Sequence, residues 1–170
     1  MKKIFTGALF VALLFTAVGA SAQKMGRVNV QGIVVGMPEM KTMQKELETI
    51  QKDFQDNLET MQVELNNKFQ EFQQTQSTMN ASVRSLKEKD MQDLSQRMQQ
   101  FEQSATQEIQ RKQNELLQPI LQKAKEAIAA EAKAGSYVVV YDESLGALAY
   151  FDEAAVTDLT PAVKTRLGVQ

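Results

Sequence analysis

The chain has 170 residues, with 19 basic and 21 acidic side chains, and it contains neither Cys nor His. The lack of these two residue types excludes disulfides, thiolate or imidazole metal sites, and catalysis by Ser-His-Asp or Cys-His arrangements. The slightly acidic balance argues against a nucleic-acid partner, which would normally be met by a basic face. We expect no enzymatic activity and no cofactor, because no strand-loop scaffold is long enough to enclose the remaining carboxylates and lysines.

The first 22 residues have the pattern of an export signal. Two lysines at positions 2 and 3 precede an apolar, uncharged run over residues 4–20, and the small residues Ala-Ser-Ala at 20–22 match a signal-peptidase site. The alternative is a membrane anchor, for which the run is slightly short. We predict cleavage after Ala22, which would leave 17 basic against 21 acidic residues in residues 23–170.

Residues 37–134 are predicted to form a helical arm. Within residues 39–134 there is no Gly and a single Pro, Pro119, and nearly every residue is compatible with a helix. Pro38 suits the first position of a helix, where its missing N–H costs nothing. Gly135 suits a helix stop in which the glycine adopts a positive φ.

The apolar residues of the arm form a narrow stripe, which must face another helix. They recur at alternating steps of three and four, with a mean close to the 3.5-residue period of a left-handed coiled coil. The stripe has one gap at Gln76, and the charged Lys112 interrupts its apolar run. Its positions are Met40, Met43, Leu47, Ile50, Phe54, Leu58, Met61, Leu65, Phe69, Phe72, Met79, Val83 and Leu86 in the first half, and Met91, Leu94, Met98, Phe101, Ala105, Ile109, Lys112, Leu116, Ile120, Ala124 and Ala127 in the second.

The two halves of the stripe predict an antiparallel hairpin. The midpoint falls near Leu86, inside the densely charged stretch 84–89, and we place the tip there. The alternative is one continuous rod that dimerises in parallel, because no strong turn residue marks the tip. We favour the hairpin because strand-forming sequences at both ends would hold the two arm termini together.

Residues 23–36 and 135–170 are predicted to form a small β body. Residues 27–30 alternate polar and apolar side chains, as a half-buried strand does. Residues 137–141 are β-branched or aromatic, residues 142–146 suit a turn, and residues 147–151 suit a returning strand. We therefore predict an α+β fold that is mostly α, in which a long antiparallel coiled-coil hairpin projects from this body.

A short helix is predicted at the end of the chain. Thr160 suits its N-cap and Pro161 its first position. An apolar face follows, and Gly168 suits the stop. The residues of this face are Leu159, Val163 and Leu167.

The β body is too small to be stable alone. About 50 residues split between two termini bury little apolar surface, and open strand edges favour pairing between chains. We therefore expect oligomerisation through the body. The residues predicted to take part are Val28, Val30, Val138, Val140, Leu148 and Tyr150.

Several segments resemble the Skp/OmpH family of periplasmic chaperones. They are the early strand 26–31, the start at Met37-Pro38-Glu39, the stretch 117–120 with the later run 135–142, and the ending through residues 150–151, 158–163 and 167–168. The resemblance spans nearly all of the chain after the predicted signal. It is most specific in the C-terminal third, because any coiled coil resembles the arms.

The resemblance implies a homotrimer with three hairpins around a cavity. Such a trimer would hold unfolded outer-membrane β-barrel proteins in the periplasm without ATP and prevent their aggregation. The Met- and Phe-rich seam fits this role, because Met adapts to irregular surfaces. The alternative for these side chains is that they only pack the seam. The alternative for the protein is a structural coiled-coil spacer or adaptor, although the seam of a spacer should be rich in Leu and Ile. The candidate client-contact residues are Met61, Phe69, Phe72, Met79, Met91, Met98 and Phe101.

The charge of the arm departs from the family's best-known members, which are strongly basic. The first arm is acidic on balance here, so no lipopolysaccharide site is carried over. The predicted tip carries a basic cluster of Arg84, Lys87 and Lys89. We expect this cluster to make weak contacts with anionic lipid head groups or with charges on the client. The alternative is that it is a solvated turn.

Pro119 is a hinge candidate near the base of the arm, or else a tolerated irregularity.

Overall fold

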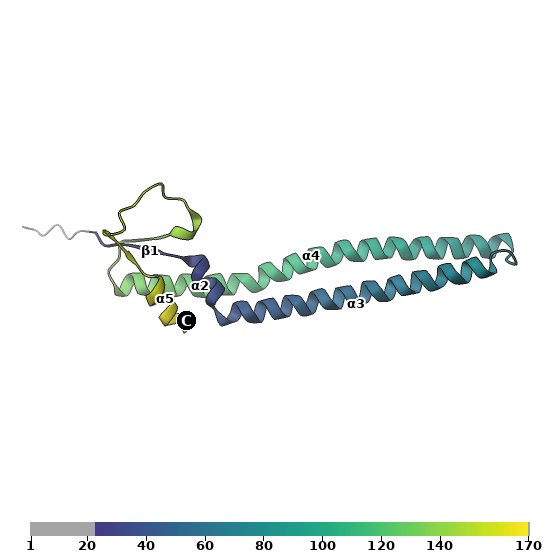
Figure 1. The fold of residues 1–170 in the computed structure, drawn as a ribbon, viewed down its shortest axis with the longest axis horizontal. Helices are drawn as coiled ribbons and strands as arrows, with labels where there is room; N and C mark the ends of the chain where they lie inside the picture. Colours follow the sequence, from purple (N-terminus) through teal and green to yellow (C-terminus); the bar gives the residue numbers. More distant parts are fainter. Residues whose placement is uncertain (1–22, 170) are drawn as a thin grey trace, which may run out of the picture.

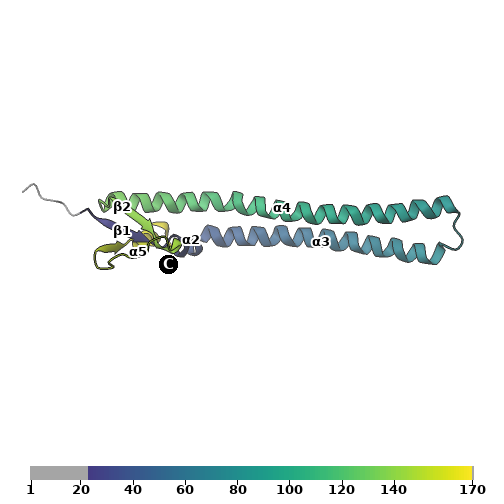
Figure 2. The same cartoon turned by 90° about the horizontal axis from the view of Figure 1, so that it is seen from above.

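The computed structural model of the chain describes residues 23–169, so the predicted export signal lies outside the described residues. Two long helices, α3 (Pro38–Thr75) and α4 (Ala81–Ala134), lie side by side and antiparallel, and they project from a small body at one end (Figures 1 and 2). With 38 and 54 residues, the helices are about 57 Å and 81 Å long at 1.5 Å per residue. The predicted α+β fold with a helical hairpin is confirmed.

The start of the arm follows the prediction. Met37 has an extended backbone (φ −67°, ψ 138°) and Pro38 occupies the first turn of α3. The fixed φ of proline is already helical, so it favours a sharp start. The side chain of Met37 is fully buried in the body, which fixes the direction in which the arm leaves.

The tip of the hairpin lies nearer the N-terminus than predicted, because the turn precedes the predicted stretch 84–89. α3 ends at Thr75 and α4 begins at Ala81, so residues 76–80 form the turn. Asn80 caps α4, because its side-chain oxygen accepts a hydrogen bond from the Val83 N–H at 2.9 Å. The prediction of a tip at residues 84–89 was wrong because the helices differ in length: the base of α4 continues past the start of α3 and packs against the body.

The end of α4 differs in detail from the prediction. Gly135 follows the helix but has φ −87°, and the positive φ of 57° belongs to Ser136 instead. Gly135 is required for space, because a Cβ there would lie 2.2 Å from Cε2 of Tyr137. The predicted stop is therefore in the right place, but the expected positive φ at Gly135 was wrong.

A three-stranded parallel sheet closes the base of the arm. β1 (Met25–Val28) lies in the centre, with β2 (Val139–Asp142) on one side and β3 (Val156–Asp158) on the other. The predicted second strand corresponds to β2. The predicted turn after it is a short 3-10 helix, η1 (Glu143–Leu145), which Gly146 ends with a φ of 60°.

Two strand predictions in the body were wrong. Val30 begins a short helix, α2 (Val30–Gly36), because the Asn29 side chain caps it by accepting a hydrogen bond from the Gly32 N–H. Residues 147–151 form an irregular loop that exposes Leu148 and Tyr150, and the returning strand is β3 instead.

The C-terminal helix α5 (Thr160–Leu167) covers the base of α4. Thr160 is its first residue rather than its N-cap, and the Thr160 hydroxyl accepts a hydrogen bond from the Asn29 N–H at 2.9 Å, which ties the helix to the end of β1. Gly168 ends α5 with a φ of 68°, as predicted. The predicted apolar face is confirmed, with Leu159 and Val163 buried and Leu167 half-buried.

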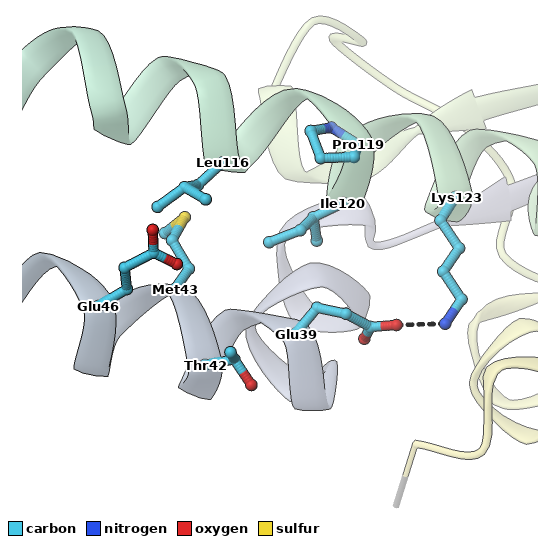
Figure 3. Close-up of a pocket in the computed structure, with 8 residues that line it drawn as sticks. All are labelled: Glu39, Thr42, Met43, Glu46, Leu116, Pro119, Ile120 and Lys123. Carbon is cyan, nitrogen blue, oxygen red and sulfur yellow. Dashed lines mark hydrogen bonds and ion pairs between the residues drawn. The ribbon is translucent and has the colours of Figure 1, made fainter.

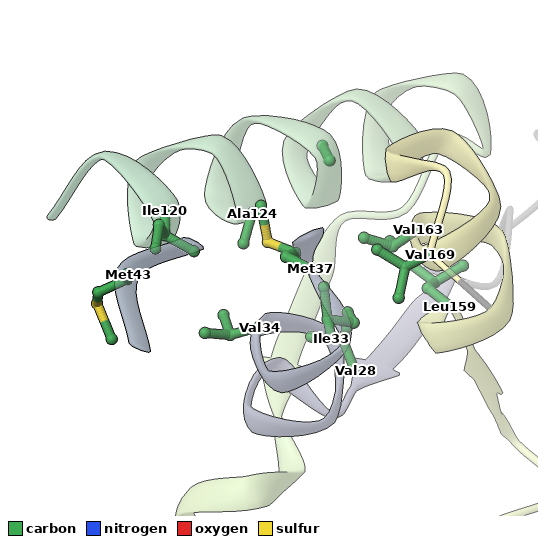
Figure 4. Packing of buried hydrophobic residues seen from close by; sticks show 11 residues of the cluster. Val28, Ile33, Val34, Met37, Met43, Ile120, Ala124, Leu159, Val163 and Val169 are labelled. Carbon is green, nitrogen blue, oxygen red and sulfur yellow. The ribbon is translucent and has the colours of Figure 1, made fainter. Parts of the chain in front are cut away.

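The hydrophobic core sits where the arm meets the body. Side chains from β1, α2, the second turn of α3, the last third of α4 and α5 converge there (Figure 4). Its centre is formed by residues with no exposed side chain, so the base of the arm is the most rigid part of the chain. The core consists of Val28, Ile33, Val34, Met37, Met43, Ile120, Ala124, Ala127, Leu159, Val163 and Val169.

Candidate functional site: the helical arm

The seam between α3 and α4 is formed by the predicted stripe. Its best-buried member on the outer part of the arm is Leu94, which is 1% exposed. The rings of Phe54 and Phe101 meet edge to face with centroids 5.6 Å apart, a favourable aromatic geometry. The two helices therefore contact each other as a coiled coil along the arm.

The candidate client-contact residues are spread along the outer arm and do not converge on a single pocket. Six of the seven lie half-buried in the seam or at the turn. Phe69 differs, because 51% of its side chain is exposed near the end of α3. These side chains form a long, discontinuous apolar surface. The six half-buried residues are Met61, Phe72, Met79, Met91, Met98 and Phe101.

Other apolar residues of the arm are exposed in places that the stripe does not explain. Val63 lies off the stripe on α3 and is about half exposed. Leu86, assigned to the stripe, is 68% exposed on α4, so it is not part of the seam. The sequence alone could have identified Val63 as an exposed apolar residue, because its position lies outside the 3.5-residue period of the stripe.

The basic cluster lies on the first turns of α4 instead of at the tip, as follows from the position of the turn. Lys87 Nζ donates a hydrogen bond to Glu71 Oε1 on α3 at 2.6 Å, and this contact lowers the pKa of Glu71. Arg84 Nη2 donates to the backbone oxygen of Gln76 at 2.8 Å. Two of the three predicted cations are thus engaged within the arm.

Further ion pairs join the two helices. Lys68 Nζ lies 2.7 Å from Asp90 Oδ2, and this contact lowers the pKa of Asp90. Near the base, Lys123 pairs with Glu39 and lowers its pKa through the same kind of hydrogen bond. These pairs fix the register of the helices at both ends of the arm.

A shallow groove lies beside Pro119 at the base of the arm. It has a volume of about 370 Å³, and its walls come from both α3 and α4 (Figure 3). α4 continues through Pro119 as one helix. Because proline cannot donate a backbone hydrogen bond, the turn of α4 next to the groove lacks one bond. The groove is lined by Glu39, Thr42, Met43, Glu46, Leu116, Pro119, Ile120 and Lys123.

The residues predicted for oligomerisation have two different environments. Val28 is buried in the core, and Val30 and Val140 pack partly against it. Val138, Leu148 and Tyr150 are exposed on the body, with Tyr150 84% exposed. The second group therefore offers an apolar surface that the single chain leaves uncovered.

Two features of other protein classes are absent from the part of the chain that the structure describes. Residues 23–169 contain no group of three or more acidic side chains arranged to hold a metal ion. Over the same range, no helix combines the length and the apolar character needed to cross a bilayer.

The chain resembles known proteins over nearly its whole length. The family model described as outer membrane protein (OmpH-like) matches residues 24–167. A protein of Yersinia enterocolitica named chaperone protein Skp is 33% identical over 152 residues, which cover 89% of this chain and 92% of that protein. The protein of the same name from Pectobacterium atrosepticum is 34% identical over 155 residues, or 91% and 93%.

The fold has a counterpart among solved structures. A putative outer membrane chaperone (OmpH-like) from Caulobacter crescentus superposes with a TM-score of 0.75 at 18% identity, over 88% of this chain and 86% of that one. This likeness shows that the hairpin and body form a known arrangement. The family-model match over residues 24–167, together with the two relatives above 30% identity, establishes that the chain belongs to the family described as outer membrane protein (OmpH-like).

Proposed function

We propose that this chain is an ATP-independent holdase chaperone of the periplasm, which binds unfolded outer-membrane proteins and prevents their aggregation. Its family and the chaperone name of its relatives support a chaperone role. The observation that carries the proposal is the arm itself, in which two long helices project from the body along a seam of partly exposed Met and Phe side chains. Many weak contacts along such an arm provide avidity for a long, unfolded client.

The client surface in this proposal is the outer arm. Met61, Phe72 and Phe101 each leave part of an apolar side chain accessible, and Phe69 exposes half of its ring. Met79, Met91 and Met98 add flexible thioether side chains, which adapt to different client sequences. Binding of this kind needs no nucleotide, because it lowers the concentration of the free client, and so its rate of aggregation, by mass action.

Three chains are proposed to assemble through the body, so that their arms surround a cavity. The support is the exposed apolar group Val138, Leu148 and Tyr150, together with the open edges of β2 and β3. Such edges pair readily with further strands. Measurement of the mass in solution tests this part separately, and a mass of one chain would contradict it.

Export and membrane contact are the remaining parts of the proposal. Removal of residues 1–22 during export would place the protein in the periplasm, and the N-terminal sequence of protein from a periplasmic extract tests this.

Contact of Arg84, Lys87 and Lys89 with anionic membranes would be weak, because two of these cations already have partners in the arm. Replacing all three with Gln should reduce binding to anionic vesicles, and unchanged binding would contradict the contact.

The central test is an aggregation assay. An outer-membrane β-barrel protein unfolded in urea is diluted into buffer without ATP, and light scattering is followed with and without this protein. We expect a near-equimolar amount of the trimer to suppress the scattering. If it does not, the chaperone function is wrong.

Two matched substitutions test whether the client surface lies on the seam side of α3. Phe69→Gln should weaken the suppression of aggregation, because it removes the most exposed ring of the seam. Val63→Gln is the control, because Val63 is equally exposed on the same helix but lies off the stripe. Equal effects of the two substitutions would contradict the proposed surface.

A further inference from the structure

Lys24 fastens the start of β1, the central strand of the sheet, to the segment that follows α4. Its backbone oxygen accepts a hydrogen bond from the Val138 N–H at 2.9 Å. Its Nζ donates to the Gly135 carbonyl oxygen at 3.2 Å and lies 5.0 Å from the centroid of the Tyr137 ring. One residue therefore anchors the strand through both its backbone and its side chain.

Gln23 lies directly before this anchor and outside the sheet. It is exposed, and β1 begins two residues later at Met25. The proposed removal of residues 1–22 would make Gln23 the first residue of the protein, with a free α-amino group. An amino-terminal glutamine carries its own electrophile, because its side-chain amide carbon can join the α-amino nitrogen in a five-membered ring.

We propose that Gln23 is a modification site, at which the amino terminus of the exported protein closes to pyroglutamate. The α-amino nitrogen of Gln23 attacks its side-chain Cδ and a new C–N bond forms. The amide nitrogen leaves as ammonia with the proton that the amine has lost. No oxidant, reductant or co-reactant is needed, because all of the reacting atoms belong to one residue. The product is a lactam, so the positive charge of the terminus is lost.

The structure accommodates the ring without a change in the sheet. All of the ring atoms belong to Gln23, whereas the nearest backbone bond to the following segment is made by the oxygen of Lys24. Lys24 Nζ also supplies the cation at the end of α4, where the carbonyl groups of a helix favour positive charge. Loss of the terminal charge should therefore leave the thermal unfolding midpoint unchanged.

The ring would protect the Lys24 anchor from trimming. Aminopeptidases need a free α-amino group, and Gln23 alone separates such a group from Lys24. Removal of both residues would take away the hydrogen bonds to Val138 and Gly135. A closed first residue thus keeps the central strand attached over its full length.

The test uses the full chain, exported and isolated from the periplasm. Its intact mass is measured at once, and a protease that cleaves after arginine then releases residues 23–27. We expect both the intact protein and this peptide to be lighter by one ammonia. A pyroglutamate aminopeptidase should remove the ring and expose Lys24, whereas a general aminopeptidase should leave the protein uncut.

Two substitutions provide matched controls. Gln23→Ala has no side-chain amide and should keep a free amino terminus, from which the general aminopeptidase removes the first residue. Gln23→Glu keeps the size of the side chain but replaces the amide with a carboxylate, a poorer electrophile, so it should stay open over the same period. All three forms should unfold at the same temperature.

This site depends on the proposed cleavage after Ala22, and the experiment separates the two. A peptide 23–27 of full mass would overturn the pyroglutamate site and leave the cleavage standing. A first residue other than Gln23 would overturn both. Neither result bears on the aggregation assay, so the site and the chaperone function can fail independently.

Discussion

The ring of Tyr137 lies over the backbone of Gly135, where α4 gives way to the sheet. A Cβ at Gly135 would lie 2.2 Å from Cε2 and 2.7 Å from Cδ2 of this ring. The ring is held in place from both sides, since the Tyr137 N–H donates to the Ala132 carbonyl oxygen at 2.9 Å and Lys24 Nζ lies 5.0 Å from the ring centroid. The position therefore admits only a residue without a side chain.

Gly135→Ala should destabilise the protein by about 1–3 kcal/mol, the usual cost of overpacking a well-ordered site. The measurement is urea unfolding followed by circular dichroism. The cost should nearly vanish when Tyr137 is first replaced with Ala, because the clashing ring is then absent. If the two substitutions are additive, the clash is not the reason for the glycine.

The sequence indicates that a helix stops at Gly135 but not why a glycine is needed there. A helix followed by Gly commonly ends with a positive φ, and this pattern led to the prediction. The actual reason is the position of the Tyr137 ring, which depends on the pairing of β2 with β1. A contact that arises from the sheet leaves no local pattern in the helix.

At the scale of elements, the ion pairs between α3 and α4 make the outer arm sensitive to acid. Contacts with Lys87 and Lys68 lower the pKa values of Glu71 and Asp90. A carboxylate with a lowered pKa in the folded state adds stability above its unfolded pKa and loses it as the pH falls through the folded value. The contribution is therefore present at neutral pH and is lost below about pH 4.

We expect the thermal unfolding midpoint of the protein to fall between about pH 5 and pH 3, and to fall less in a Lys68→Gln, Lys87→Gln double variant. Lys52→Gln is the matched control, because Lys52 pairs with Asp56 within α3 and does not join the helices. Circular dichroism at a series of pH values measures the midpoint. The same acid response in the double variant and in the wild type would rule out these pairs as the cause.

Pro119 is the one residue inside α4 that cannot donate a backbone hydrogen bond to the helix. Pro119→Ala should restore the bond to the Glu115 carbonyl and stabilise the protein by about 1–3 kcal/mol. If Pro119 is a hinge, hydrogen exchange in the adjacent turns should also become slower. Gln118→Ala is the control, because it improves helix propensity at an exposed neighbouring position without restoring a bond. Unchanged stability and exchange in Pro119→Ala would contradict both expectations.

The arm could be predicted from the sequence, but its turn and the last strand could not. The 3.5-residue period is a long-range pattern, and it located the seam because packing between α3 and α4 repeats the same contact many times. The start of α4 after the turn is marked by the side-chain cap of Asn80, which is easily missed in a polar region. β3 has three residues, too few for a pattern, whereas the stronger strand-like run 147–151 has no partner strand.

At the scale of the whole molecule, the exposed edge of the body should control assembly. Val139→Lys places a charge on β2, an edge strand, at a side chain that is exposed in the single chain. We expect this variant to have the mass of one chain by light scattering and to keep its helical circular dichroism, because the seam lies within the chain. Val35→Lys is the control, since Val35 is exposed on α2 outside the strands. Two variants of equal mass would contradict assembly through this edge.

The central position of β1 determines the order in which the molecule forms. Its partners are residues 139–142 and 156–158, so the first strand stays unpaired until almost the entire chain has been synthesised. The hairpin can start from contacts that are close in sequence, because its turn at residues 76–80 joins the two helices. Zippering from this turn toward the base brings the distant strands together and removes most of the entropy of closing so long a loop. We therefore expect the hairpin to form before the sheet at its base, and a hairpin that forms slowly would leave β1 free to pair with a strand of another chain.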